Sequence, residues 1–361
     1  MGDKKLNIAV VGASGYTGGE LLRLLIGHPQ VSITALISSE KSAGRTVPEV
    51  FPHLASLLPL PFEQLDANAI GRKADLIFLA LPHTRSFSLV AELLLLGKPV
   101  IDLSADYRLR DPAQYKEWYQ VTHPFPDLLN EAVYGLPELH REAIRNSRLI
   151  AVPGCYPTAA ILQCAPLVAG GLIEPTRIII DAKSGISGGG RSPALPYHFP
   201  EAHESIHSYK IGNHRHTPEI EQELQWVSHT HQSSQTPHTR LAPISFTPHL
   251  IPINRGILST AYATVTPSIN ISNWLSVYQD YYKGERFIRL FDSTDAIDPH
   301  HVRGSNFCDI AITQNQRSGS VISVAALDNL VKGAAGQALQ AMNLMMGFPE
   351  DLGLSAPGLF P

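Results

Sequence analysis

The sequence contains little cysteine and no concentrated positive charge. Its 361 residues include three cysteines, Cys155, Cys164 and Cys308, an odd number without the spacing of a metal site. A chain of this length folds without disulfide bonds, so this cysteine content indicates a reducing compartment, with the cytoplasm as the expected location. The 28 lysines and arginines form no run, and the net charge is -4. These features argue against nucleic acid or an acidic membrane as partner and favour a small, discrete ligand.

Long apolar runs are also missing, and we expect no leader sequence. No apolar run reaches the length of a membrane-spanning helix, and the first residues lead directly into a strand pattern rather than a signal peptide. We therefore expect a soluble protein that is not exported. A chain of 361 residues with 44% hydrophobic residues can fill more than one core, which favours two domains.

A short apolar strand at residues 6–11 is followed by a glycine-rich turn and then a helix-like run at 20–25. The glycine spacing is GxxGxxG rather than GxGxxG, but backbone without Cβ atoms still lets a pyrophosphate approach the N–H groups of a helix N-terminus. A glycine triplet alone could be a plain turn, but its place after the first strand favours a dinucleotide site. The candidate cofactor-binding residues of this turn are Gly12, Ser14, Gly15, Tyr16, Thr17 and Gly18.

The end of the next predicted strand, residues 31–37, bears on which dinucleotide binds. An NAD site usually has a carboxylate here that holds the ribose 2′-hydroxyl. This sequence has Ser38 and Ser39, with Arg45 nearby, and these suit a 2′-phosphate better. We therefore expect these three residues to bind NADP, with NAD as the alternative because Glu40 lies only slightly further along.

Strands and helices continue to alternate in the first half of the chain. Residues 74–80 and 99–104 have the pattern of buried strands, and a leucine-rich helix is predicted between them at 88–96. This alternation predicts an α/β fold with a Rossmann-like, doubly wound parallel sheet.

The second half of the chain has a different character. β-rich runs at 244–266 and 308–327 flank a helical segment at 271–282, which predicts a second, α+β domain with a mixed or antiparallel sheet. The polar segment 225–239 is predicted to be an exposed loop. The last predicted helix, 329–346, is rich in small residues and is therefore suited to close packing on another element.

A cysteine lies in a tight turn, residues 152–158, just before an apolar helix-like run. Pro157 suits the first turn of that helix, which places Cys155 at its N-terminal end. Free N–H groups and the positive end of the helix dipole lower a thiol pKa there and make the thiolate available. We interpret Cys155 as a catalytic nucleophile, and the alternative is an ordinary small buried residue.

Two histidines, His214 and His216, lie just before another predicted helix. A cysteine nucleophile needs a base that takes and returns its proton, and histidine has a suitable pKa. We therefore interpret the pair as catalytic, with Glu219 as a nearby substrate-binding candidate. The alternatives are a helix start with exposed histidines, or a metal site; the spacing of possible ligands does not suit a metal, and we expect none.

Two further stretches have features of anion-binding sites. The glycine-rich loop 184–191 is dense in N–H groups, with Arg191 adding charge, and it is equally compatible with a mobile linker. Ser104 and Arg108 follow a predicted strand and could hold a phosphate by charge-assisted hydrogen bonds. The competing interpretation is a surface ion pair between Asp106 and Arg108.

Taken in order along the chain, six stretches resemble the N-acetyl-γ-glutamyl-phosphate reductase family. They are 12–18, 102–109, 133–138, 153–158, 183–191 and 214–219, within matches that extend from residue 8 to about residue 340. The resemblance implies an enzyme of arginine biosynthesis that reduces an acyl phosphate to an aldehyde with NADPH. It also implies a fold and mechanism related to those of aspartate-semialdehyde dehydrogenase. The segment 225–239 and the proline-rich C-terminal tail are not matched.

The resemblance also implies roles for individual residues. Cys155 would accept the acyl group as a thioester with release of inorganic phosphate, and one histidine of the pair would be the acid/base. We favour His216, which is next to the predicted helix cap, and expect His214 to bind substrate. Asn329 would contact the nicotinamide amide. Further cofactor-binding candidates are Ser187 and Gly188, and the substrate-binding candidates are Ser104, Arg108, Arg191 and Glu219.

These expectations define a domain scheme and its alternatives. Residues 1–154 would bind NADP, 155–327 would provide catalysis and dimerisation, and 328–361 would pack back on the first domain. We expect a homo-oligomer, either a tetramer or a dimer formed through the second domain's sheet. An aspartyl phosphate or a carrier-linked aminoadipyl phosphate is an alternative substrate. Two other classes stay open: a non-catalytic NADP-sensing regulator, which does not need the thiol, and a thiol-dependent hydrolase or acyltransferase, which does not need the glycine turn.

Overall fold

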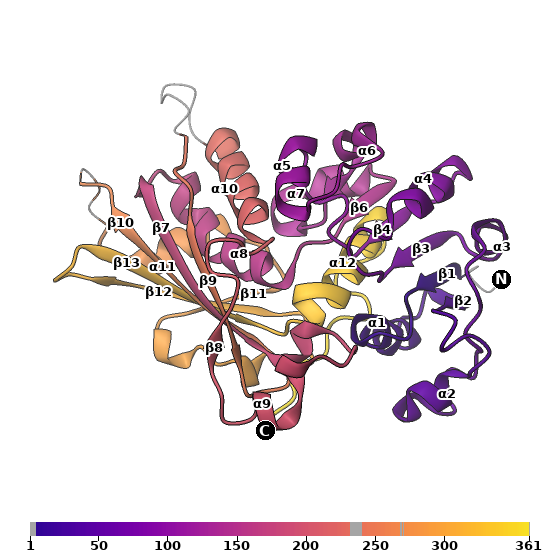
Figure 1. The fold of residues 1–361 in the computed structure, drawn as a ribbon. Helices are drawn as coiled ribbons and strands as arrows, with labels where there is room; N and C mark the ends of the chain where they lie inside the picture. The colour runs from indigo at the N-terminus through magenta and orange to yellow at the C-terminus, as the bar shows by residue number, and fades with distance from the viewer. Residues whose placement is uncertain (1–4, 232–239, 268, 270, 361) are drawn as a thin grey trace. The chain divides into compact units, whose positions relative to one another are not determined.

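In the computed structural model, the described residues are 5–231, 240–267, 269 and 271–360. The chain divides into two compact units: Met1–Gly154 with Ala334–Ala356, and Cys155–Gly333 with Pro357–Pro361. The last helix therefore belongs with the N-terminal half, and Figure 1 shows it in yellow among indigo and purple elements. Within the described ranges, none of the helices combines the length and the apolar character needed to span a membrane.

The first unit is built on a six-stranded parallel sheet with the order β2-β1-β3-β4-β6-β5. The strands are β1 (Leu6–Val11), β2 (Val31–Ile37), β3 (Leu76–Leu79), β4 (Val100–Asp102), β5 (Val133–Tyr134) and β6 (Leu149–Ala151). The chain runs to opposite sides of β1, with β2 on one side and β3 on the other, and ligands of such sheets bind at the carboxyl ends of the strands beside this switch point. The predicted doubly wound parallel sheet is confirmed.

The helices of the first unit are α1 (Tyr16–Ile26), α2 (Val47–Val50), α3 (Ala67–Lys73), α4 (Phe87–Leu95), α5 (Pro112–Tyr119), α6 (Pro126–Glu131), α7 (Pro137–Arg145) and α12 (Gly336–Met345). Helix α12 packs against α1 and α7, and its Ala338 is fully buried. Polar bonds fix its position, because Gln340 Nε2 donates to Glu138 Oε1 at 3.2 Å and His28 Nε2 lies 3.0 Å from Asn343 Oδ1.

The second unit has a seven-stranded mixed sheet with the order β11-β12-β13-β10-β7-β9-β8. The strands are β7 (Ile173–Gly185), β8 (His207–Ser208), β9 (Ser245–Ile251), β10 (Ile257–Val265), β11 (Ile288–Phe291), β12 (Cys308–Asn315) and β13 (Ser320–Leu327). The pairs β7–β9 and β11–β12 are parallel and the others are antiparallel. The predicted mixed sheet of the second domain is confirmed.

Helix α8 (Cys155–Ala169) packs on this sheet at β7, β10 and β13, and it also contacts α10 (Thr217–His231) and α11 (Trp274–Tyr281). Residues alternate along β10: Ile257 and Ala261 are buried, whereas Tyr262 and its neighbours on the opposite face are partly exposed. The alternation shows that one face of the sheet lies under apolar cover while the other has partly exposed side chains.

The prediction of an exposed loop at 225–239 is wrong for its first part. Helix α10 continues to His231, so residues 225–231 are helical, and 232–239 lie outside the described residues. The helix continues because a buried stripe with helical spacing runs from Ile220 through Leu224 to Val227. The polar composition of this segment hid that stripe, since most of its polar residues lie on the other side of the helix.

Candidate active site

Cys155 is the first residue of α8, and it is the partly exposed cysteine of the three. Cys164 and Cys308 are buried, and burial raises the pKa of the Cys164 thiol to about 12. Most of α8 beyond Cys155 is buried, including Pro157 in the first turn. An accessible thiol at the start of a buried helix meets the physical requirement for a nucleophile, namely access combined with nearby N–H groups and the positive helix end.

Gly333 packs directly against this cysteine. It belongs to η6 (Val331–Ala335), a π-helix, and a Cβ atom added to it would lie 2.8 Å from Cys155 Cβ and 3.1 Å from Cys155 Cα. The Gly333 N–H donates to the Asp328 carbonyl at 2.9 Å, which holds the backbone in this place. The absence of a side chain at position 333 therefore helps to set where the thiol lies.

The predicted histidine pair packs around the residue that follows the cysteine. The His214 and His216 rings lie 4.8 Å apart, and the Tyr156 ring lies 5.8 Å from His214 and 6.0 Å from His216. The backbone N–H of His216 donates to the imidazole Nδ1 of His214 at 3.2 Å. Because Nδ1 accepts this bond, a neutral His214 carries its proton on Nε2. His214 is buried and His216 is half-buried, so the structure brings the pair and the cysteine helix together.

Glu219 and Arg191 differ in their surroundings. Glu219 follows the histidine pair in sequence, in the first turn of α10, and only 1% of its surface is exposed. Arg191 is the last residue of the glycine-rich loop and is exposed. Glu219 is therefore a buried carboxylate, whereas Arg191 is an exposed guanidinium.

The loop predicted to bind anions is folded and tethered. Residues 186–189 form a short 3-10 helix after β7, and Asn329 Nδ2 donates to Ser187 Oγ at 2.9 Å. Asn329 Oδ1 also accepts from the Gly256 N–H at 2.8 Å, and a Cβ atom on Gly188 would lie 3.8 Å from Asn329 Nδ2. The structure thus brings together three cofactor candidates, Ser187, Gly188 and Asn329, that are about 140 residues apart in sequence.

The glycine turn of the first unit forms an open helix start. Gly12 has φ +79°, and a Cβ atom there would lie 2.3 Å from the Ala80 carbonyl oxygen, so close packing requires glycine. A Cβ atom on Gly18 would lie 2.6 Å from the Gly12 oxygen. Gly15 differs, because its added Cβ would meet only the Gly12 oxygen, at 3.6 Å. Gly15 is the N-cap of α1 and supplies no side-chain cap, which leaves first-turn N–H groups for an anion.

The other members of this turn and the NADP candidates lie at neighbouring strand ends. Tyr16 is 42% exposed, and Ser14 and Thr17 are half-buried. The Gly12 N–H donates to the Ile37 carbonyl at 2.9 Å, which places the glycine turn beside the end of β2. There Ser38 is nearly buried while Ser39 is exposed. Arg45 donates to the Glu49 carbonyl from an exposed position.

Ser104 lies in the interior rather than at an anion site. It is fully buried, and its Oγ donates to Asp102 Oδ2 at 2.6 Å. Ser86 Oγ joins the same network, 3.0 Å from Asp102 Oδ2 and 2.9 Å from Asp106 Oδ2. A side chain without exposed surface has no direct route to a ligand, so the structure does not support the predicted contact of Ser104 with substrate. We assign Ser104 to the network that supports this loop.

Arg108 is also nearly buried. Its Nε donates to the Val152 carbonyl at 2.7 Å and its Nη2 to the Leu103 carbonyl at 2.9 Å. The alternative of a surface ion pair with Asp106 is wrong, because Asp106 is buried and accepts from the Thr84 N–H at 2.6 Å. Arg108 therefore anchors the backbone that leads toward the cysteine turn.

The buried Asp102 carboxyl predicts a pH-dependent stability. Burial raises the pKa of Asp102 from 3.8 to about 6, and the nearby Asp106 carboxylate adds to the shift. A raised pKa means that folding favours the protonated form of Asp102. The contribution of this carboxyl group to stability is therefore fully present below pH 4 and is lost as the pH rises through 6. The difference between 3.8 and about 6 corresponds to about 3 kcal/mol.

Urea unfolding from pH 4 to pH 7 of the wild type and of Asp102→Asn measures this effect. Asparagine mimics the protonated form, so the variant should gain about 3 kcal/mol relative to the wild type as the pH rises. The exposed Asp127→Asn serves as control and should show no such relative gain. Parallel curves for the wild type and Asp102→Asn would contradict the prediction.

Comparison with known proteins identifies the family. Residues 7–147 match the semialdehyde dehydrogenase NAD binding domain, and residues 155–329 match the semialdehyde dehydrogenase dimerisation domain. A protein of Geotalea daltonii named N-acetyl-gamma-glutamyl-phosphate reductase is 50% identical over 357 residues, which cover 99% of this chain and 100% of that protein. A protein of Syntrophobacter fumaroxidans with the same name is 48% identical and covers 97% of this chain and 98% of its own length.

This chain belongs to the N-acetyl-γ-glutamyl-phosphate reductase family.

Solved structures share the fold of this reductase family member. Aspartate semialdehyde dehydrogenase II from Vibrio cholerae, complexed with ASA, has a TM-score of 0.69 at 17% identity and covers 95% of this chain and 99% of its own. The Candida albicans aspartate semialdehyde dehydrogenase with NADP has a TM-score of 0.69 at 15% identity, with the same coverage. At such identities the likeness concerns the fold. The matched NAD binding domain supports a nicotinamide cofactor.

Two tyrosines that pack against the histidine pair were not predicted from the sequence. Tyr156 directly follows the cysteine, and the Tyr209 ring lies 5.4 Å from that of His214. Burial raises the pKa of both phenols well above its ordinary value, so both stay protonated at neutral pH. Only the adjacency of Tyr156 to Cys155 could have signalled a role in the sequence, whereas nothing local marks Tyr209.

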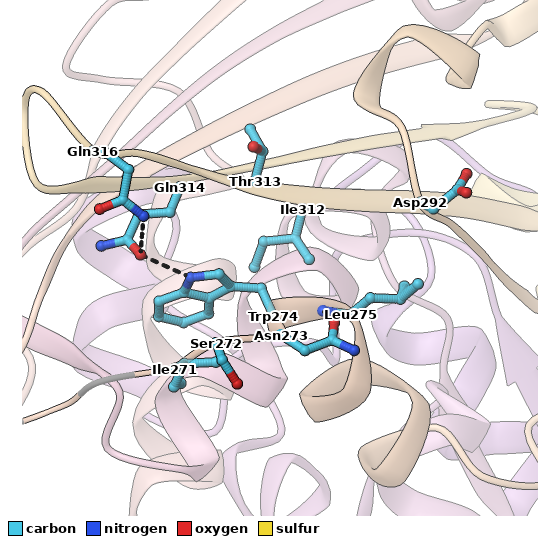
Figure 2. Close-up of a pocket in the computed structure, with 10 residues that line it drawn as sticks. All are labelled: Ile271, Ser272, Asn273, Trp274, Leu275, Asp292, Ile312, Thr313, Gln314 and Gln316. Atoms are coloured by element: carbon cyan, nitrogen blue, oxygen red, sulfur yellow. Dashed lines mark hydrogen bonds between the residues drawn. The ribbon is translucent and has the colours of Figure 1, made fainter.

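A separate cavity of about 480 Å³ lies in the second unit of the reductase, between α11 and β12 (Figure 2). Trp274, Asn273 and Gln316 line it, and Trp274 Nε1 donates to Gln314 Oε1 at 3.1 Å. No candidate site residue lines this cavity. It is therefore distinct from the candidate active site.

Proposed function

We propose that this chain is an NADPH-dependent N-acetyl-γ-glutamyl-phosphate reductase, which converts N-acetyl-L-glutamyl 5-phosphate to N-acetyl-L-glutamate 5-semialdehyde. The observation that carries the proposal is the partly exposed Cys155 at the start of α8, followed by Tyr156, whose ring packs against both imidazoles. The names of relatives at 48–50% identity supply the acyl group. They favour this substrate over an aspartyl or carrier-linked aminoadipyl phosphate, and the thiol and imidazoles argue against a non-catalytic regulator.

The reaction begins at the Cys155 thiolate. Its sulfur attacks the γ-acyl carbon, a C–S bond forms, the C–O bond to phosphate breaks, and inorganic phosphate leaves. When bound, a nicotinamide cofactor would supply the hydride that reduces the resulting thioester. The acid/base would give a proton to the carbonyl oxygen as the hydride adds, which yields a thiohemiacetal. When the acid/base takes that proton back, the C–S bond breaks, and the aldehyde and the Cys155 thiolate are released.

His216 is the favoured acid/base of this sequence. The His214 Nδ1 atom accepts the backbone N–H of His216, and protonation of that atom would break the bond. His216 is also more exposed than His214, which suits a group that exchanges protons with substrate. We therefore assign His214 to orientation and substrate binding, and Glu219 to the substrate amide or to a histidine.

The chain's own residues fit a dinucleotide phosphate. The open start of α1 at Gly15 offers N–H groups to the pyrophosphate, and the end of β2 offers Ser39 and Arg45 to a 2′-phosphate, which favours NADP over NAD. In the second unit, Asn329 would hold the nicotinamide amide together with Ser187 and Gly188. Arg191 and Arg108 are the candidates for substrate anions.

We also propose assembly and location for this enzyme. The second unit matches a domain described as a dimerisation domain, and the partly exposed face of its sheet is the surface that would meet a second copy. A homodimer through this face, or a tetramer built from such dimers, is the proposed assembly. The cytoplasm is the proposed location, where the reduced thiol of Cys155 persists.

Gly15→Ala should weaken NADPH binding without harming the fold. The added methyl meets only the Gly12 oxygen at 3.6 Å inside the protein, but it occupies the approach to the first-turn N–H groups. We expect the Kd for NADPH to rise about tenfold or more, which is about 1.4 kcal/mol. Gly27→Ala at the other end of α1, where the Cβ would lie 3.7 Å from the Leu24 oxygen, is the matched control. Equal affinities of both variants would refute the placement of the pyrophosphate.

The proposed function is tested by the reverse reaction. Purified protein is given N-acetylglutamate semialdehyde, inorganic phosphate and NADP, and reduced cofactor is followed by absorbance. Phosphate-dependent reduction of NADP is expected, with much slower rates on aspartate semialdehyde or with NAD. Activity on aspartate semialdehyde alone would move the assignment to another acyl phosphate. NADP binding without activity on either aldehyde would favour the regulator class.

A further inference from the structure

Tyr156 is attached at both ends of its side chain. Its backbone lies in the first turn of α8, next to Cys155, and its hydroxyl donates to the His249 carbonyl in β9 at 2.9 Å. The Tyr209 hydroxyl donates to the Tyr156 hydroxyl at 3.4 Å. With 2% of its surface exposed, the Tyr156 ring has little room to turn. Burial therefore holds the ring in place between the cysteine helix and the sheet, and the hydroxyl bond adds a second attachment.

The same ring contacts both imidazoles edge to face. It is inclined at 89° to the His214 ring and 68° to the His216 ring, and the Phe246 ring lies 5.5 Å away. Edge-to-face contacts depend on ring orientation, so the position of Tyr156 constrains both imidazoles. The backbone N–H of His216 also donates to His214 Nδ1, which holds the His214 ring against the backbone of its neighbour, and the two imidazole rings lie 4.8 Å apart.

We propose that Tyr156 is a positioning residue that sets the orientation of the His214–His216 pair relative to the Cys155 thiol. The proposal rests on the proposed function, since it requires the imidazole pair to exchange protons with the Cys155 chemistry. Burial keeps the Tyr156 phenol protonated, so its hydroxyl serves as a fixed donor rather than as a base. The ring, and not the hydroxyl alone, performs the positioning.

The test compares Tyr156→Leu, which removes the ring, with Tyr156→Phe, which removes only the hydroxyl. A misplacement of about 1 Å costs about a hundredfold in rate, so kcat of Tyr156→Leu should fall between about 10-fold and 100-fold. The KM for NADP should stay within about twofold, and Tyr156→Phe should keep most of the activity. Tyr282→Leu is the matched control, because the Tyr282 hydroxyl also donates to a backbone carbonyl, that of Leu162 in α8.

A second readout does not depend on the substrate. The rate of alkylation of Cys155 by iodoacetamide is measured against pH. This rate follows the fraction of thiolate, which depends on the charge of a nearby imidazole. The midpoint should shift in Tyr156→Leu and stay in place in Tyr282→Leu. Superposable pH profiles of Tyr156→Leu and the wild type would overturn the proposal, as would equal losses in Tyr156→Leu and Tyr156→Phe. An inactive wild type with a shifted alkylation profile would refute the substrate assignment alone.

Discussion

Replacement of Cys155 with alanine is expected to abolish aldehyde formation while dinucleotide binding continues. The variant has no thiol to carry the acyl group, and the glycine turn that would bind the cofactor lies in the other unit. Loss of an enzyme nucleophile costs far more than loss of a binding contact, so we expect a decrease of about a thousandfold or more in kcat/KM. The reverse reaction measures the activity, and fluorescence of bound NADPH measures the binding.

Cys308→Ala provides the control for this experiment. Cys308 is fully buried in β12, so its replacement should lower stability without removing activity per folded molecule. If Cys155→Ala keeps substantial activity, the thioester route is excluded. If it loses NADPH binding together with activity, the loss reports unfolding rather than chemistry.

Gly333→Ala has the second-largest expected effect. The new methyl would lie 2.8 Å from Cys155 Cβ, closer than real Cβ contacts, and the obstacle is the nucleophile itself. Either the start of α8 or the π-helix must move, and an error of about 1 Å at reacting atoms costs about a hundredfold in rate. We therefore expect kcat to fall about a hundredfold, measured in the same assay, with NADPH affinity little changed.

Gly170→Ala tests whether this effect is specific to the thiol. It lies just beyond the other end of α8, and its added Cβ would meet the Leu172 side chain at 2.9 Å. The steric conflict is similar in size but remote from Cys155, so stability should fall while kcat per folded molecule is kept. Equal losses of kcat in both variants would show that general damage to α8, and not displacement of the thiol, is responsible.

The parts of the site that the sequence predicted are those with local causes. A glycine turn between a strand and a helix, and Cys155 ahead of an apolar run with Pro157, are encoded within a few residues. The pairing of His214 with His216 is equally local. Each of these signals combines backbone conformation with residue chemistry in one short segment, so no knowledge of distant contacts is needed.

The parts that escaped prediction depend on contacts between distant segments. Ser104 has the residue type of an anion site, but the parallel sheet brings Ser86 and Asp106 around it and buries all three. Gly333 approaches Cys155 only because the chain returns after some 180 residues. The helical course of residues 225–231 was obscured by their polarity, since a half-exposed helix needs only a narrow apolar stripe.

Because the three cysteines differ in burial, the number of competent active sites in a preparation can be counted from the thiols that react. A thiol reagent added to the folded protein should react with Cys155 and be excluded from Cys164 and Cys308, which are 1% and 0% exposed. The same reagent in denaturant should react with all three. The ratio of the two readings reports the fraction of molecules with a competent thiol, so rates measured on different preparations can be expressed per active centre.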